Sequence, residues 1–129
     1  MKREIKFRGK RIDNGEWVYG MPAFNRDCTG IDKIEEPMKA GGICRLVDPE
    51  TVGQYTGKKD IEGNELYDGD ITIDEFYRKS IIYWSEKMAR FAFRENRKKT
   101  EFYLVIEHLK VKKIGNRWDN PDLLEGGYR

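Results

Sequence analysis

Alternating apolar and charged positions near the start of the chain predict a β-hairpin over residues 3–20. Residues 4–8 alternate in this way, and a second apolar run follows the turn sequence Asp13-Asn14-Gly15. Alternation with a period of two is typical of a strand with one face on a core, and Asn-Gly tolerates the positive φ that a tight hairpin turn requires. We therefore expect two antiparallel strands with Trp17 packed inward.

Further short apolar runs predict strands in the middle of the chain, over residues 43–47, 70–77, 80–84 and 88–93. Residues 102–114 fit neither the helical nor the strand period cleanly, but their β-branched content favours a strand. Glycines and prolines interrupt any period over residues 21–42, which we expect to form a long surface loop.

The end of the chain predicts a short helix. Asp119 or Asn120 can cap it, Pro121 suits its first turn, and Gly126-Gly127 can end it. We expect Leu123 and Leu124 to pack on the sheet. The whole pattern predicts an all-β (mainly β) fold: a small twisted sheet or partly open barrel of short strands with hairpins, plus a short C-terminal helix. No linker divides the sequence, so residues 1–129 are expected to form a single domain.

Composition narrows the class of protein. Hydrophobic residues make up 38% and charged residues 37% of the 129 residues, which predicts a thin core with much solvated surface. The net charge of +2 gives no general reason to expect binding to nucleic acid or a membrane. No run approaches the roughly 18 apolar residues of a membrane span. Cys28 and Cys44 are widely spaced and the first residues lack an apolar signal segment, so we expect a cytoplasmic protein with two reduced thiols.

Residues that carry catalysis or bind metal are few. His108 is the only histidine, so any Ser-His-Asp or Cys-His arrangement must use it. Its strand-like surroundings favour a surface or core-edge imidazole instead. Zinc would require Cys28, Cys44, His108 and a carboxylate to converge from three distant segments, and no pair of them has ligand spacing. We therefore expect no catalytic, metal or cofactor-binding residues, and a protein that is not an enzyme.

One acidic group invites a second interpretation, a Mg²⁺-dependent nuclease site. Its members are Asp68, Asp70, Asp74 and Glu75. Carboxylates of this kind can hold Mg²⁺ for phosphodiester hydrolysis. Asp68 and Asp70, however, lie in a turn that explains both of them, so turn chemistry and solvated charge are the favoured explanation.

A basic and aromatic segment is the strongest candidate binding site. Its candidate nucleic-acid-binding residues are Arg90, Arg94, Arg97, Lys98 and Lys99. Phe91 and Phe93 interleave with the arginines. An aromatic strand beside a basic loop is typical of single-strand nucleic-acid binding. The alternative is a hairpin whose Phe side chains face the core and whose basic side chains are solvated, and this alternative is favoured.

Three blocks, in this order along the chain, resemble the YopX family. The first is residues 3–8 and the last is residues 114–124. The central block is Gln54-Tyr55-Thr56-Gly57-Lys58-Lys59-Asp60 followed by Gly63-Asn64-Glu65-Leu66-Tyr67-Asp68-Gly69-Asp70-Ile71. The resemblance implies a small, mostly β protein encoded by a phage or prophage, and it brings no established biochemical function or catalytic residues.

Two hypotheses for function lead, and the metal-dependent nuclease comes third. The first is a non-enzymatic phage accessory protein, acting in the bacterial host cytoplasm through a protein partner or self-association. The second is a single-stranded nucleic-acid-binding module that uses the 90–99 hairpin. The sequence also leaves open whether residues 54–70 are a structural device or a ligand-binding loop, although their turn residues favour the structural role.

Overall fold

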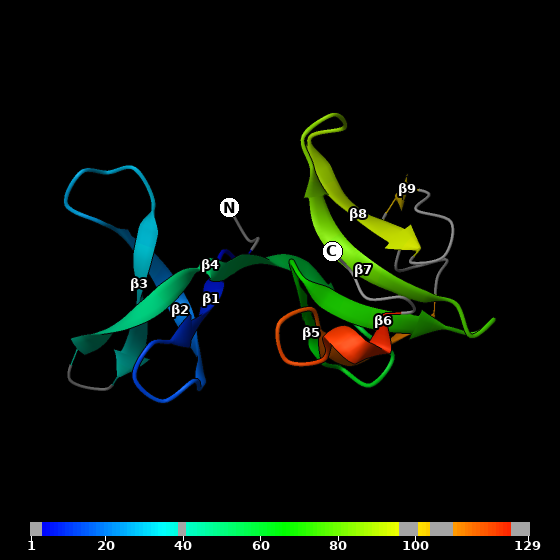
Figure 1. The fold of residues 1–129 in the computed structure, drawn as a ribbon, viewed down its shortest axis with the longest axis horizontal. Helices are drawn as coiled ribbons and strands as arrows, with labels where there is room; N and C mark the ends of the chain where they lie inside the picture. The colour runs from blue at the N-terminus through cyan, green and yellow to red at the C-terminus, as the bar shows by residue number, and fades with distance from the viewer. Residues whose placement is uncertain (1–3, 39–40, 96–100, 104–109, 125–129) are drawn as a thin grey trace. The chain divides into compact units, whose positions relative to one another are not determined.

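The computed structural model describes residues 4–38, 41–95, 101–103 and 110–124 (Figure 1). It divides into two compact units, residues 1–55 and 56–129. The boundary falls inside strand β4 (Gly41–Lys59), so no linker marks it in the sequence. A single domain over residues 1–129 stays a prediction. Among the described residues, no helix is long and apolar enough to cross a membrane.

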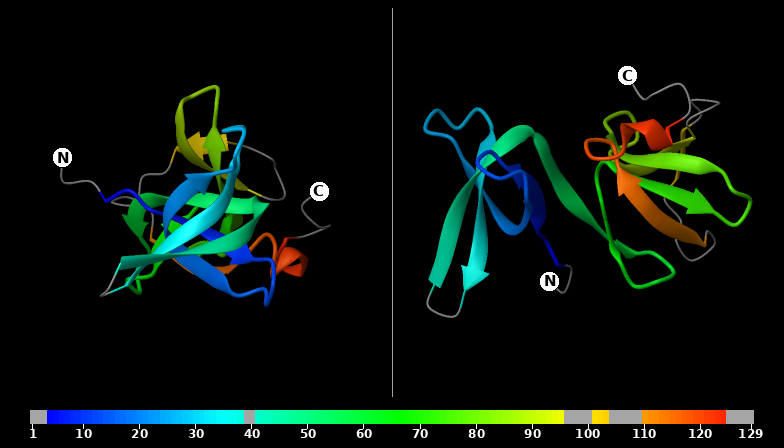
Figure 2. Two further views of the ribbon diagram at one scale, coloured as in Figure 1. Left: turned by 90° about the vertical axis from the view of Figure 1, so that its left-hand side faces the viewer. Right: turned by 60° about the horizontal axis from the view of Figure 1, so that its bottom comes forward.

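In its described part, the first unit contains strands β1 (Phe7–Arg11), β2 (Trp17–Phe24), β3 (Ile31–Met38) and most of β4. Each strand pairs with the next in antiparallel fashion, and β1 also pairs with β4, so the sheet closes into a partial ring (Figure 2). Val18, Ile34 and Val47 form its core. Gly9 faces this core because an added Cβ would lie 2.9 Å from a Val47 methyl group.

The predicted hairpin over residues 3–20 is confirmed by the antiparallel pairing of β1 with β2. Its turn is longer than two residues, because the Arg11 N–H donates to the Glu16 carbonyl at 2.8 Å. Gly15 takes a positive φ of 73°, while the Asn14 side chain accepts the Glu16 N–H at 2.9 Å. Asn14 therefore stabilises the turn through its side chain rather than through a positive φ.

The inward packing expected for Trp17 is wrong. Trp17 pairs with Lys10, and its ring lies 4.6 Å from the Arg8 guanidinium carbon. The next residue, Val18, enters the core instead. Successive side chains of a strand point to opposite faces, so the longer turn determines which of the two neighbours faces inward.

The long loop expected over residues 21–42 is also wrong. This segment contains the second half of β2, all of β3 and the start of β4. The register between β2 and β3 shifts between Ala23 and Phe24. This irregularity breaks the period-two pattern, and glycine and proline within the strands obscure it further.

The second unit contains, in its described part, β5 (Glu65–Tyr67), β6 (Asp70–Asp74), β7 (Lys79–Ser85), β8 (Arg90–Glu95), β9 (Glu101–Tyr103) and β10 (Val111–Asn116). Its antiparallel sheet has the order β10-β6-β7-β8-β9, and β5 extends the sheet that contains β4. One core cluster contains Ile82 and Phe93, and another contains the neighbouring Ile81. Since Ile81 and Ile82 point to opposite faces, both faces of this sheet are packed.

The predicted C-terminal helix is a single 3₁₀ turn, Pro121–Leu123. The Asn120 side chain accepts the Asn116 N–H at 3.2 Å and does not cap the turn. Leu124 is buried against Ile71 and Ile81, with Leu123 packed beside it, which confirms the expected packing of both leucines. The all-β fold class is confirmed.

Candidate functional site

The outward face of β2, β3 and β4 carries a group of exposed side chains opposite the core of the first unit. Residues that pair across antiparallel strands point to the same face, and so do residues two apart along one strand. We call this surface the outer face; its two cross-strand rows are Met21, Glu35 and Cys44, then Ala23, Lys33 and Leu46.

Large apolar side chains on the outer face are exposed to solvent. Met21 is 52% and Leu46 is 58% exposed. Ile12, which is 65% exposed, lies beside Leu46 because its N–H donates to the Leu46 carbonyl at 3.2 Å. Tyr19, two residues before Met21, extends the exposed surface along β2.

Two opposite charges lie at the centre of the outer face, on β3. The Lys33 ammonium is 2.8 Å from the carboxylate of its neighbour Asp32. Glu35 is exposed, and its side chain lies over Gly42, where an added Cβ would be 2.6 Å from the Glu35 Cδ. Within the described residues, no ion pair engages Glu35. The face is thus apolar at its flanks and carries one cation and one anion at its centre.

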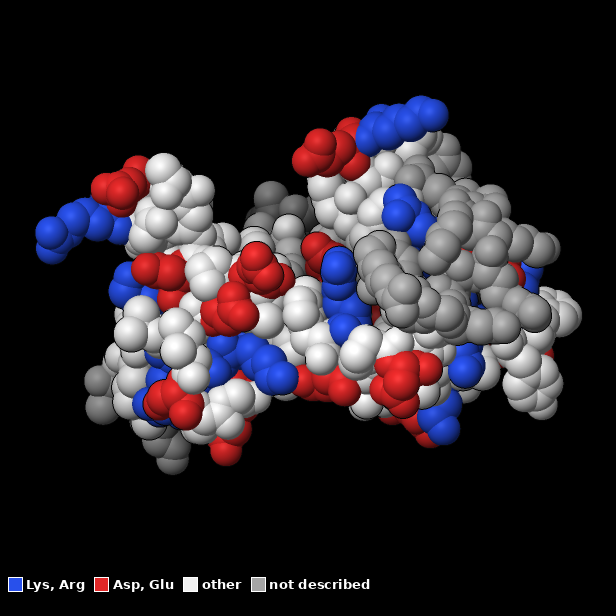
Figure 3. Space-filling model, viewed as in Figure 1, with Lys and Arg blue, Asp and Glu red and all other residues white. Residues whose placement is uncertain are grey.

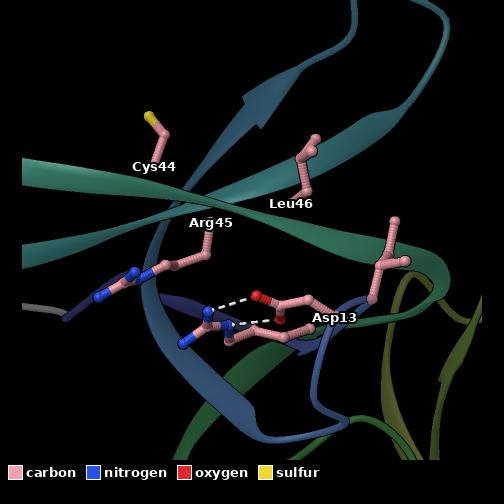
Figure 4. Close-up of a pocket in the computed structure, with 6 residues that line it drawn as sticks. Asp13, Cys44, Arg45 and Leu46 are labelled. Carbon is pink, nitrogen blue, oxygen red and sulfur yellow. Dashed lines mark hydrogen bonds and ion pairs between the residues drawn. The ribbon is translucent and has the colours of Figure 1, made fainter.

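The opposite side of β4 is chemically different. Figure 4 shows Cys44 and Leu46 on one side of the strand and Arg45 on the other. Arg45 Nε pairs with Glu36 at 3.0 Å, and Arg11 donates two hydrogen bonds to Asp13, at 2.9 and 2.6 Å. The Arg11 hydrogen bonds lower the pKa of Asp13. A pocket of about 310 Å³ takes in residues from both sides of β4, since it is lined by Arg11, Ile12, Asp13, Cys44, Arg45 and Leu46. Each arginine in it already has a carboxylate partner.

The structure describes two of the five predicted basic candidates. Arg90 and Arg94 lie on β8, whereas Arg97, Lys98 and Lys99 lie outside the described residues. Arg94 stacks over the Tyr83 ring, with its guanidinium carbon 4.4 Å from the ring centroid.

The aromatic residues of the same strand point the other way. Phe93 is 1% exposed and belongs to the core. Phe91 packs against that core and meets the Trp84 ring edge-on at 5.1 Å. Alternation along β8 therefore separates the two arginines from the two phenylalanines, so the predicted strip of phenylalanines and arginines on one face does not form.

The turn-rich central block is held together by its aspartates. The Asp60 carboxylate accepts the backbone N–H groups of Glu62, Asn64 and Lys113 at 2.8–2.9 Å. Burial alone would raise the pKa of Asp60, but these hydrogen bonds together outweigh burial and lower it. Asp70 is fully buried, accepts the Tyr67 N–H at 2.7 Å and lies 3.2 Å from the Lys113 ammonium. These contacts support the structural role of residues 54–70.

The predicted acidic group is distributed along β6 and the turns that flank it. Asp74 closes the β6–β7 turn by accepting the N–H groups of Phe76 and Arg78 and the Arg78 guanidinium. In the described ranges, no three His, Cys, Asp or Glu side chains form a group that could hold a metal ion. His108 lies outside the described residues. Cys28 and Cys44 are both free and exposed.

A family model supplies the decisive comparison, because the model of the YopX protein family matches residues 6–125. The chain belongs to the YopX family. A solved structure with the same fold is "Crystal structure of protein EF1440 from Enterococcus faecalis". This YopX protein matches it with a TM-score of 0.61 and 20% identity, over 94% of this chain and 98% of that chain. The search of curated proteins found no match.

The outer face was not predicted from the sequence as a site. Met21, Lys33 and Glu35 fall in the segment expected to be a loop, so their common orientation was hidden. A partial signal exists: Tyr19, Met21 and Ala23 repeat at every second position. Only the pairing of β2 with β3 and β4 shows that these residues share a face with Leu46.

Proposed function

We propose that this YopX protein is a non-enzymatic binding module that acts through protein–protein contacts of its outer face. The observation that carries the proposal is the exposure of large apolar side chains on the first unit: Met21 and Leu46 on the outer face, and Ile12 next to Leu46, are each more than half exposed. Single exposed apolar residues are common on soluble proteins. Several large apolar side chains exposed together on one face of a protein are typical of an interaction surface.

The backbone of the face also suits binding. Its rows lie on three hydrogen-bonded strands in the first unit. A surface that is already ordered loses less conformational entropy on association than a loop does. Methionine and aromatic side chains are enriched in protein interfaces, and Met21 and Tyr19 supply both kinds here.

On the face shown in Figure 3, the described charges give no competing preference for nucleic acid. Basic and acidic side chains are intermixed on each unit in the view of Figure 3. The nucleic-acid hypothesis requires stacking as well as charge, and Phe93 lies in the core. Membership of the YopX family supports the further proposal that the protein is a phage or prophage accessory protein of the bacterial cytoplasm, where exposed thiols such as Cys28 and Cys44 stay reduced.

The two thiols provide the test. Cys44 lies on the outer face, while Cys28 lies in the Asn25–Gly30 turn that connects β2 to β3. The protein is added at low concentration to an extract of its host cell, and alkylation of each thiol is followed by mass spectrometry. We expect Cys44 to react at least about threefold more slowly than in buffer and Cys28 to react at an unchanged rate.

A variant shows whether that protection comes from the outer face. Leu46→Ser removes an exposed side chain and should abolish the protection of Cys44. Ile61→Ser is the matched control, because Ile61 is 63% exposed and lies in the second unit. Equal reaction rates of Cys44 in extract and in buffer, at every protein concentration, would contradict the proposed function.

A further inference from the structure

We propose that the outer face binds a second copy of the chain, forming a two-fold symmetric dimer. This inference rests on the proposed function and names the partner. The order of side chains in the two rows of the face is self-complementary under a two-fold axis. Lys33 and Glu35 are two residues apart on β3, roughly 7 Å at the rise of an extended strand, and they are opposite in charge.

A two-fold interface brings the same surface of both copies together. One axis suits this face. It lies between the outer faces of the two copies, runs perpendicular to β3, and passes midway between Lys33 and Glu35. This axis places each Lys33 over the partner's Glu35. An axis parallel to β3 would instead place Lys33 over the partner's Lys33, and like charges in contact oppose association.

The flanking positions agree with the same axis. In one row the β2 residue is large, Met21, and the β4 residue is small, Cys44. In the other row the β2 residue is small, Ala23, and the β4 residue is large, Leu46. The axis therefore places Met21 over the partner's Ala23 and Leu46 over the partner's Cys44. Large side chains that meet small ones interdigitate and fill the space between two sheets.

The central charges also fit a second copy better than an unrelated partner. Glu35 is exposed and has no ion-pair partner within the described residues. Lys33 contacts the adjacent Asp32 and keeps about a third of its side chain exposed. Each copy thus offers one cation and one anion at the spacing that another copy requires, and the apolar flanks become covered without leaving an unpaired charge in the interface.

Charge-reversal variants test the pairing. We expect wild-type protein to be a dimer by analytical ultracentrifugation. Lys33→Glu and Glu35→Lys should each weaken dimerisation at least about tenfold, because each brings like charges together across the axis. An equimolar mixture of the two variants should restore association, since the new carboxylate at position 33 of one chain then faces the new ammonium at position 35 of the other. Thermal unfolding of each variant verifies that it is folded.

Controls and a second measurement separate this result from a general charge effect. Arg26→Glu and Glu50→Lys reverse exposed charges outside the outer face and should leave the dimer unchanged, alone or mixed. Raising the concentration of pure wild-type protein should slow alkylation of Cys44 and not of Cys28.

Three results would overturn the second-copy inference: a monomer at all concentrations, a dimer insensitive to both reversals, or no restoration on mixing. The proposed function fails separately, because a monomer whose Cys44 is protected in extract still binds another protein through the outer face.

Discussion

Asp60 and Lys113 are 53 residues apart in the sequence, yet the Asp60 Oδ2 accepts the backbone N–H of Lys113 at 2.9 Å. The same carboxylate accepts the N–H groups of Glu62 and Asn64 through Oδ1. One side chain therefore forms a tight turn and joins that turn to β10. This relationship gives the turn-rich block of the YopX family a physical role in the second unit.

Asp60→Asn tests that role. Asp60 Oδ2 now accepts two hydrogen bonds, one from the Lys113 N–H and one from the Asn64 side-chain amide. The amide nitrogen of Asn, placed at Oδ2, cannot accept either of them. We expect the free energy of unfolding to fall by about 2 kcal/mol, the cost of leaving partly buried donors unsatisfied. Urea denaturation measures it. Glu62→Gln, an exposed neighbour, is the control, and equal losses for both variants would contradict the assignment.

The stability of the same site should depend on pH. The pKa of Asp60 is lowered in the folded protein, so its contribution is fully present above the unfolded pKa of about 3.9. It is lost as pH falls through the folded pKa, because the protonated acid accepts these bonds poorly. We expect the difference in unfolding free energy between wild type and Asp60→Asn to shrink from pH 6 to pH 3. A difference that stays constant would show that the carboxylate charge is irrelevant.

Two glycines in the same block differ in their surroundings. Gly63 and Gly69 both have positive φ, 85° and 93°. An added Cβ at Gly63 meets nothing within 4 Å, whereas at Gly69 it would lie 2.3 Å from the Trp118 ring. We expect Gly63→Ala to cost about 1 kcal/mol, from the left-handed backbone alone. Gly69→Ala should cost about 3 kcal/mol because overpacking adds to it. Similar losses in thermal unfolding would show that Trp118 moves away without cost.

Local turn chemistry was predictable from the sequence to a useful degree. Asn14-Gly15 identified the first hairpin, because positive φ at glycine and side-chain acceptance by asparagine are local effects. The face of the sheet on which Trp17 lies was not predictable, since it depends on the length of the turn. A one-residue change in register moves every side chain of a strand to the other face.

Long-range strand pairing explains why the strands in residues 21–42 and the outer face were not predicted. The bulge between β2 and β3 near Phe24 removes the alternation that identifies a strand, so residues 21–42 looked like a loop. The outer face exists only through the pairing of Met21, Glu35 and Cys44. These residues come from three segments, and no local pattern relates them. By contrast, the arginine–phenylalanine alternation of β8 did predict core phenylalanines, and Phe93 confirms it.

The first turn supplies a further prediction. Asn14→Ala removes the acceptor of the Glu16 N–H, and Gly15→Val forces a β-branched residue to adopt a φ of 73°. We expect the double variant to lose about 2 kcal/mol of unfolding free energy, since β-branched residues are strained there. Nothing lies within 4 Å of an added Cβ at Gly15, so the loss would report backbone strain and the missing Asn14 acceptor rather than a clash at Cβ. Wild-type thermal stability would refute the turn assignment.

The last prediction separates protein binding from nucleic-acid binding. Binding to single strands would require the basic side chains near β8, and each phosphate contact would release counterions. We expect no gel shift of single-stranded DNA or RNA at low salt, because the aromatic side chains of β8 pack in and against the core, on the face away from Arg90 and Arg94. A shift would support the alternative if the triple variant Arg97→Ala, Lys98→Ala, Lys99→Ala lowered the log–log salt slope by about two units, at roughly 0.7 per contact. Glu50→Lys controls for net charge. In that outcome the Phe93→Ala variant should lose about 3–5 kcal/mol of unfolding free energy, because a core ring is removed. It should not selectively weaken nucleic-acid binding.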